Sequence, residues 1–147
     1  MMIDEAWKIQ VDRQLQTLMD FFRMQAGNNF LQTPLAGSWG GLNVSTTPKT
    51  KIDLSDIFGV PPSIRSVLLY VSYHDSGSAG SDCQIIFSPN DTAGAGTSVG
   101  SFGLPDDKWT FGQVIVPCND EGDIYFQITA SGASTMDVYI QVLGYWV

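Results

Sequence analysis

The feature that most constrains the fold is a hydrophobic period of two residues, which recurs through most of the chain. In IRSVLLYVSYHD, Val67, Leu69, Val71 and Tyr73 alternate with a second set that begins at Leu68. The same alternation returns in DIYFQITA and in the closing stretch MDVYIQVLGYWV. β-branched and aromatic residues at this spacing are typical of strands. Clusters such as SGSAGSD and PCNDEGD are typical turns. The chain from about residue 40 onward is therefore predicted to be all β.

The closing stretch is apolar or aromatic on both of its faces. Val138, Ile140 and Val142 alternate with Tyr139, Gln141, Leu143 and Tyr145. A strand that is apolar on both faces lies deep in its domain or at a subunit contact. We expect a central strand whose second face meets a neighbouring subunit. The residues predicted to take part in this association are Tyr139, Leu143 and Tyr145.

Residues 3–26 have a different period. They contain no Gly or Pro, and they are rich in residues that favour helices. The helix packs either on its own domain or against other copies of the chain, and we expect association because it precedes every strand. The predicted contact stripe starts at Ile3 and continues through Trp7, Val11, Leu15, Leu18 and Phe22.

These two periods define the predicted fold class. It is mainly β: an antiparallel β-sandwich, jelly-roll-like, preceded by one N-terminal α-helix. We expect the helix in residues 1–27, for trimerisation or anchoring, a Gly- and Pro-rich linker in 28–40, and the sandwich as a head domain in 41–147.

Charge and composition exclude several function classes. The net charge is −8 and the sequence pI is about 4.2, so the chain offers no basic patch for nucleic acid. No apolar run approaches the roughly 20 residues of a membrane-spanning helix, and we expect no membrane insertion. The start MMIDEAWKIQ lacks the pattern of a signal peptide. Cys83 and Cys118 are expected to be reduced thiols rather than a cross-strand disulfide.

A resemblance adds to this description. The stretch IDLSDIFGVPPSIRSVLLYVSYHDSGSAGSD resembles a module of bacteriophage tail-fibre and other virion proteins, and VYIQVLGYW resembles its closing strand. The likeness covers most of residues 49–88 and 136–147. It implies a homotrimeric virion component with a helical stalk or anchor and a sandwich head. It also implies contacts with other virion proteins and synthesis in the host bacterial cytoplasm without a signal peptide.

No convincing catalytic set is present. His74 is the only histidine. It is either a solvated residue at a strand end or a base beside Asp75, and no nucleophile motif supports the second option. The acidic pairs Asp106–Asp107 and Asp120–Glu121, the latter near Asp123, are typical of turns, although such carboxylates also serve glycosidases and Ca²⁺ sites. We expect no enzyme, no metal and no cofactor.

Two tryptophans remain as binding candidates. Trp39 lies in GSWGG, where no predicted strand would bury it, and Trp109 follows the acidic turn PDDK. Such rings can stack on sugars of a host surface glycan, or they can pack at a trimer seam. The leading hypothesis is a tail-fibre-type component for host attachment. The alternatives are a trimeric capsid cement or decoration protein and, more distantly, a carbohydrate-active enzyme.

Overall fold

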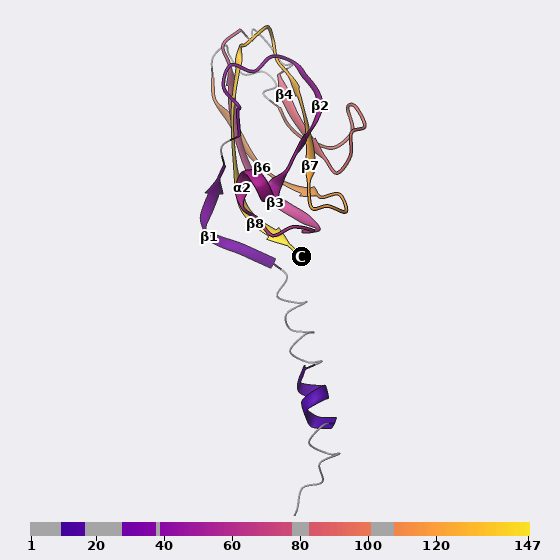
Figure 1. Ribbon diagram of the computed structural model, residues 1–147. Helices are drawn as coiled ribbons and strands as arrows, with labels where there is room; N and C mark the ends of the chain where they lie inside the picture. The colour runs from indigo at the N-terminus through magenta and orange to yellow at the C-terminus, as the bar shows by residue number, and fades with distance from the viewer. Residues whose placement is uncertain (1–9, 17–27, 38, 78–82, 101–107) are drawn as a thin grey trace, which may run out of the picture.

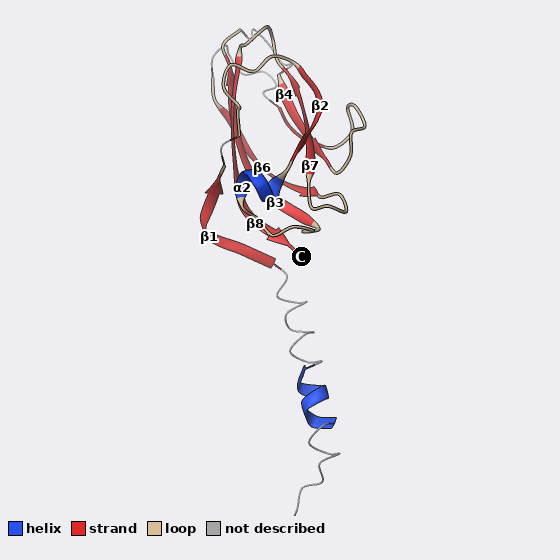
Figure 2. Ribbon diagram, viewed as in Figure 1, coloured by secondary structure: helices blue, strands red, loops and turns tan. Residues whose placement is uncertain are grey.

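The computed structural model describes residues 10–16, 28–37, 39–77, 83–100 and 108–147. Two antiparallel four-stranded sheets lie face to face, and a short helix closes one end between them (Figures 1 and 2). The predicted fold class, a mainly β sandwich with an N-terminal helix, is confirmed.

The strand order is that of a jelly roll. The first sheet, called here the β8 sheet, runs in the order β1 (Asn28–Ala36), β8 (Met136–Trp146), β3 (Ser66–Asp75), β6 (Thr110–Pro117). The second, the β7 sheet, runs in the order β2 (Thr47–Ile52), β7 (Ile124–Thr129), β4 (Gln84–Ser88), β5 (Thr97–Gly100). The chain changes sheet after every strand except β4, so most neighbours in a sheet are distant in sequence.

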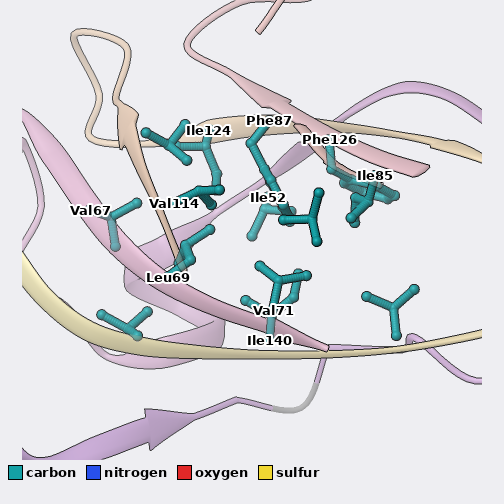
Figure 3. Packing of buried hydrophobic residues seen from close by; sticks show 14 of the residues in the cluster. Ile52, Val67, Leu69, Val71, Ile85, Phe87, Val114, Ile124, Phe126 and Ile140 are labelled. Carbon is teal, nitrogen blue, oxygen red and sulfur yellow. The ribbon is translucent and has the colours of Figure 1, made fainter. Parts of the chain in front are cut away.

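The core fills the space between the two sheets. Alternate residues of β3 are buried, as are those of β7, in the register that the sequence predicts. Figure 3 shows these side chains meeting in the middle, with Leu69 and Val71 from one sheet and Ile85 and Phe87 from the other. The opposite faces of β3 and β8 are consequently left on the outside of the sandwich.

The closing strand is central, as predicted. β8 pairs with β1 on one side and with β3 on the other. A bulge interrupts its alternation, because Leu68 pairs with Gly144 whereas Leu69 pairs with Val142. An extra residue in one strand reverses the facing of the residues beyond it. Tyr145 therefore lies opposite the buried Val67 and packs against the core, so its predicted place on the outer face beside Tyr139 is wrong.

The expected linker is in part a strand. Residues 28–36 form β1, which pairs with β8 along the edge of the sheet. Sequence inspection missed it because Pro34 and the register shift between Phe30 and Leu35 hide the alternation. An edge strand tolerates proline, since one of its sides needs no backbone donors. The sandwich thus begins at Asn28 rather than at residue 41.

Two further segments differ from expectation. KIDLSDIF was expected to be extended, but its second half is the helix α2 (Leu54–Phe58). The Asp53 carboxylate caps α2 by accepting from the Asp56 N–H, and Gly59 ends it at φ +71°, a conformation that favours glycine. β5 lies in the Gly-rich segment TAGAGTSVG, which shows no two-residue alternation in the sequence.

The N-terminal helix is described over residues 10–16. Figure 1 shows this segment apart from the sandwich. Leu15 is 52% exposed, and Val11 is partly buried. Trp7, Leu18 and Phe22, also predicted to be in the contact stripe, lie outside the described residues. Within the described part of the chain, no helix has the length and apolar character needed to cross a membrane.

Candidate binding face

The outward surface of the β8 sheet is the main candidate site, and we call it the outer face. It is formed by alternate residues of β3, β6 and β8, together with the residue that precedes β6. Its members are Leu68, Tyr70, Ser72, His74, Trp109, Phe111, Gln113, Ile115, Asp137, Tyr139 and Gln141. Trp109, Phe111, Ile115 and Tyr139 are each about half exposed or more. Large apolar groups gathered on one surface mark an interaction site.

An aromatic cluster occupies one end of the outer face. The ring centroids of Trp109 and His74 are 4.2 Å apart, and those of Trp109 and Tyr139 are 5.5 Å apart. The His74 Nε2 lies 3.2 Å from an oxygen of Asp137, its partner across the β3–β8 pair. The strands bring these residues together because directly opposed positions of an antiparallel pair project from the same side. The cluster thus combines two partly exposed rings with a carboxylate and an imidazole.

A groove lies beside this cluster. It encloses about 290 Å³, and Tyr139 and Tyr70 are among its lining residues. Ser72 and Gln141 supply hydrogen-bonding groups, and Ala36 and Gly37 lie where β1 ends. Tyr70 also stacks on Phe111, with centroids 6.4 Å apart. The groove therefore lies between two aromatic pairs, Trp109–Tyr139 and Tyr70–Phe111.

Trp39 has a different role from the one predicted. Its ring is partly buried and meets Phe126 edge to face, with centroids 5.0 Å apart, so it packs against the core and also lines the groove. The chain then passes close to β8: the Val138 N–H donates to the Gly41 carbonyl at 2.7 Å, and a Cβ on Gly41 would collide with the Val138 carbonyl oxygen. Trp39 is a wall of the groove rather than a free platform, whereas Trp109 is exposed as expected.

His74 lies beside Asp137 rather than beside Asp75. Neighbouring residues of a strand point to opposite faces. Asp75 is buried toward the core side, whereas the side chain of His74 lies on the outer face, 18% exposed, beside Asp137. The hypothesis of a base beside Asp75 is therefore wrong, whereas the position of His74 near the end of β3 agrees with the other hypothesis. The outer face carries only these two ionisable groups besides its tyrosines, although the chain as a whole has a net charge of −8.

Asp75 joins two loops, the β3–β4 connection and the β7–β8 connection. Its carboxylate accepts hydrogen bonds from the Gly77 N–H, from the Ser131 N–H and hydroxyl, from the Thr135 hydroxyl and from the Cys83 thiol. Burial raises the pKa of Asp75, but the hydrogen bonds from Ser131 and Gly77 outweigh that effect and bring the pKa down to about 2. This carboxylate holds the loops at the end of the sandwich nearest His74.

We expect Asp75→Asn to destabilise the fold and to change its acid sensitivity. The folded pKa is below that of the unfolded chain, so the carboxylate stabilises the fold above about pH 4, and this stabilisation disappears as the pH falls toward 2. The shift corresponds to about 2 kcal/mol, and an asparagine NH₂ would also oppose the N–H donors. Urea unfolding between pH 7 and pH 2 measures it. Asp91→Asn, on an exposed loop, is the control, and equal pH dependence in parent and Asp75→Asn would contradict the prediction.

The acidic loop around residue 121 has structural partners. Lys51 pairs with Glu121 at 3.1 Å and with the buried Asp123 at 2.9 Å, and Asp123 also accepts from the Leu54 N–H. These carboxylates, first Asp123 and then Glu121, raise the pKa of Lys51. Asp120 is exposed nearby, whereas Asp106 and Asp107 lie outside the described residues. The loop therefore joins β2, α2 and β7.

The remaining reactive groups have buried or partly buried settings. Cys83 and Cys118 are free thiols. Burial, followed by the nearby Asp123 carboxylate, raises the pKa of Cys118 to about 12, so its reactive thiolate is scarce at neutral pH. Among the residues that the structure describes, no three His, Cys, Asp or Glu side chains gather as a metal site would require.

Sequence reasoning found part of the outer face and missed the rest. It singled out Trp109 and Tyr139, but it did not connect them with His74, Asp137 or Tyr70. The alternation of β3 already placed Tyr70 and His74 on one side, which was the available signal. The strand order was needed to show that β8 and β6 flank β3 and bring their side chains beside it. Leu143, predicted for association, lies partly buried at the bulge of β8.

Comparison with known proteins yields only distant structural likenesses. No protein-family model matches the chain, and no curated protein matches it in sequence. The coat protein of Tobacco streak virus is 7% identical, with a TM-score of 0.43, over 78% of this chain and 81% of that one. A family 35 carbohydrate binding module from Clostridium thermocellum is 13% identical, with a TM-score of 0.38, over 64% and 66%. Both are β-sandwich proteins, and likenesses at this level do not transfer a function.

Proposed function

We propose that this chain is a structural protein of a bacteriophage virion, a short homotrimeric component of tail-fibre type that attaches the particle to its host. Its N-terminal helix joins the protomers and mounts them on other virion proteins, and its sandwich faces outward. The protein acts by binding rather than by catalysis. The observation that carries this proposal is a difference between the two ends of the outer face.

The end nearest the N-terminal segment is apolar. The chain enters the sandwich at Asn28, which pairs with Trp146 beside the C-terminus (Figure 1). A row of Cα partners crosses all four strands there, from Phe30 through Gly144 and Leu68 to Ile115. Phe30 is 66% exposed and Ile115 is 55% exposed. An exposed apolar row next to the stalk suits contact between protomers.

The helix supports the same arrangement. Leu15 is half exposed in the single chain, and the helical residues 10–16 lie apart from the sandwich (Figure 1). Burying a leucine side chain is worth roughly 1.5–3 kcal/mol, and a trimer gains this once for each copy. The sandwich carries most of the negative charge, since residues 27–147 hold eleven acids and four bases. Mutual repulsion of the heads favours contact through the nearly neutral N-terminal part.

The end farthest from Asn28 has a different composition. It holds Trp109, Tyr139, His74 and Asp137, with the groove beside them. Rings interspersed with hydrogen-bonding groups are typical of recognition sites rather than of permanent seams. In a protein mounted by its N-terminus, this end points away from the particle and toward the host.

Electron microscopy of labelled particles tests the assignment. Virions from a host strain that carries the gene are purified and incubated with gold-labelled antibody against residues 28–147. We expect gold at the tail tip. Gold over the capsid would replace the fibre assignment with the cement or decoration alternative. Particles that contain none of the protein by mass spectrometry would overturn the virion assignment altogether.

A further inference from the structure

We infer that the groove on the outer face binds a neutral hexose unit of a host surface glycan, stacked between Tyr139 and Tyr70. This inference deepens the proposed attachment function and rests on it. The binding unit consists of the two tyrosines, Ser72 and Gln141, with the Trp109–His74–Asp137 cluster adjoining it.

The shape of the groove fits a small ligand. Its volume of about 290 Å³ lies just below the roughly 300–1,000 Å³ of drug-sized ligand sites, which suits a single sugar unit. Tyr139 and Tyr70 are diagonal neighbours on the outer face. Tyr139 pairs with Ser72 of β3, and Tyr70 pairs with Gln141 of β8. Ser72 is a small residue on β3, and its neighbours across the sheet are Tyr139 on β8 and Phe111 on β6. Tyr70 is the next residue on the same face of β3. A bulky residue in place of Ser72 would fill the space between the rings.

The chemistry of the lining fits a sugar. One face of a hexose ring is a sheet of C–H groups, which an aromatic ring attracts through its negative face. The hydroxyls around the hexose need donors and acceptors together. The Gln141 amide offers both, and so does the Ser72 hydroxyl. The groove places these groups beside the rings, whereas an interface with an apolar partner would leave them without hydrogen bonds.

The electrostatics select a neutral ligand. Asp137 precedes Tyr139 by two residues on the same face of β8, and residues 27–147 hold eleven acids and four bases. The His74 imidazole is held against Asp137, so any positive charge that it carries is offset by its partner. A sialylated or phosphorylated glycan would meet repulsion here. Neutral hexoses and N-acetylhexosamines meet none.

Tryptophan fluorescence tests the inference on the full chain. The probes are maltotriose, cellotriose, mannotriose, galactotriose and chitotriose, with sialyllactose as the anionic comparison. Trp109 touches Tyr139 and Trp39 lines the groove, so a bound sugar that displaces water shifts their emission. We expect at least one neutral trisaccharide to bind with a Kd below about 10 mM and sialyllactose not to bind.

Two variants locate the site. Tyr139→Ala removes one wall and Ser72→Leu fills the floor, and each is expected to weaken binding by at least about tenfold. Tyr125→Ala, which removes a partly exposed tyrosine from the opposite sheet, is the matched control and should bind as the parent does. Circular dichroism confirms that each variant is folded. Unchanged binding in both groove variants would overturn the inference.

Two other outcomes would distinguish a sugar site from a subunit seam, and a failed sugar site from a failed virion assignment. If Tyr139→Ala and Ser72→Leu lower the oligomeric mass and the control does not, the groove is a subunit seam and the inference is wrong. If no neutral trisaccharide binds while gold still marks the tail tip, the sugar site fails and the virion assignment stands.

Discussion

Deleting residues 1–27 is expected to leave a folded sandwich that no longer assembles or joins the virion. The cut falls just before β1, whose pairing with β8 begins at Asn28, so every strand and the whole core remain. The deleted segment carries the predicted apolar stripe, with Leu15 half exposed in the single chain. Far-ultraviolet circular dichroism, light scattering and virion incorporation measure the three consequences. The expected pattern is retained β signal, monomer mass and loss of incorporation.

A single substitution sharpens the same prediction. Leu15→Asp places a charge in the stripe, whereas Gln14→Asp places the same charge on the neighbouring exposed position outside it. Loss of a buried leucine costs about 2–5 kcal/mol, and a symmetric trimer incurs this three times. Leu15→Asp should therefore dissociate the trimer at micromolar concentration, while Gln14→Asp stays assembled. A truncated protein that remains trimeric would show that the helix does not hold the protomers together.

The sequence was sufficient to predict the sandwich because its signals are local. The two-residue period of β3, β7 and β8 arises directly from which side chains face the core. Tertiary features were not predictable in this way. The bulge that turns Tyr145 inward depends on how β8 pairs with β3, and β1 is a strand because the edge of β8 is available to it. Weak local patterns become strands when a partner supplies the hydrogen bonds.

The candidate site was less predictable than the fold. Trp109 and Tyr139 are 30 positions apart in the sequence, and nothing in the sequence connects the two residues. They touch because a single strand, β3, lies between β6 and β8, and large side chains can reach each other across it. Ser72 carries no pattern that would mark it in the sequence, yet its small side chain leaves the space between the rings of Tyr139 and Tyr70. A site made across three strands is a property of the strand order, which hydrophobic periodicity does not specify.

Phe87→Ala is expected to be the most destabilising single truncation in the sandwich. Phe87 lies on β4 with none of its surface exposed, among side chains from both sheets (Figure 3). Truncating a buried phenylalanine to alanine costs about 3–5 kcal/mol, because the cavity loses its packing as well as the transfer free energy. Domains of this size are stable by only about 5–15 kcal/mol, so a large part of the stability would be lost.

Phe111→Ala is the matched control, because it makes the same chemical change on the outer face. Phe111 is 73% exposed and stacks on the ring of Tyr70 at 6.4 Å between centroids. Its loss should change the free energy of unfolding by about 1 kcal/mol or less, the range of an exposed aromatic pair. Urea unfolding of residues 28–147, monitored by tryptophan fluorescence, separates folding from assembly. A cost for Phe111→Ala as large as that for Phe87→Ala would mean that the outer face is covered even in the single sandwich, and the groove would then be closed to any ligand.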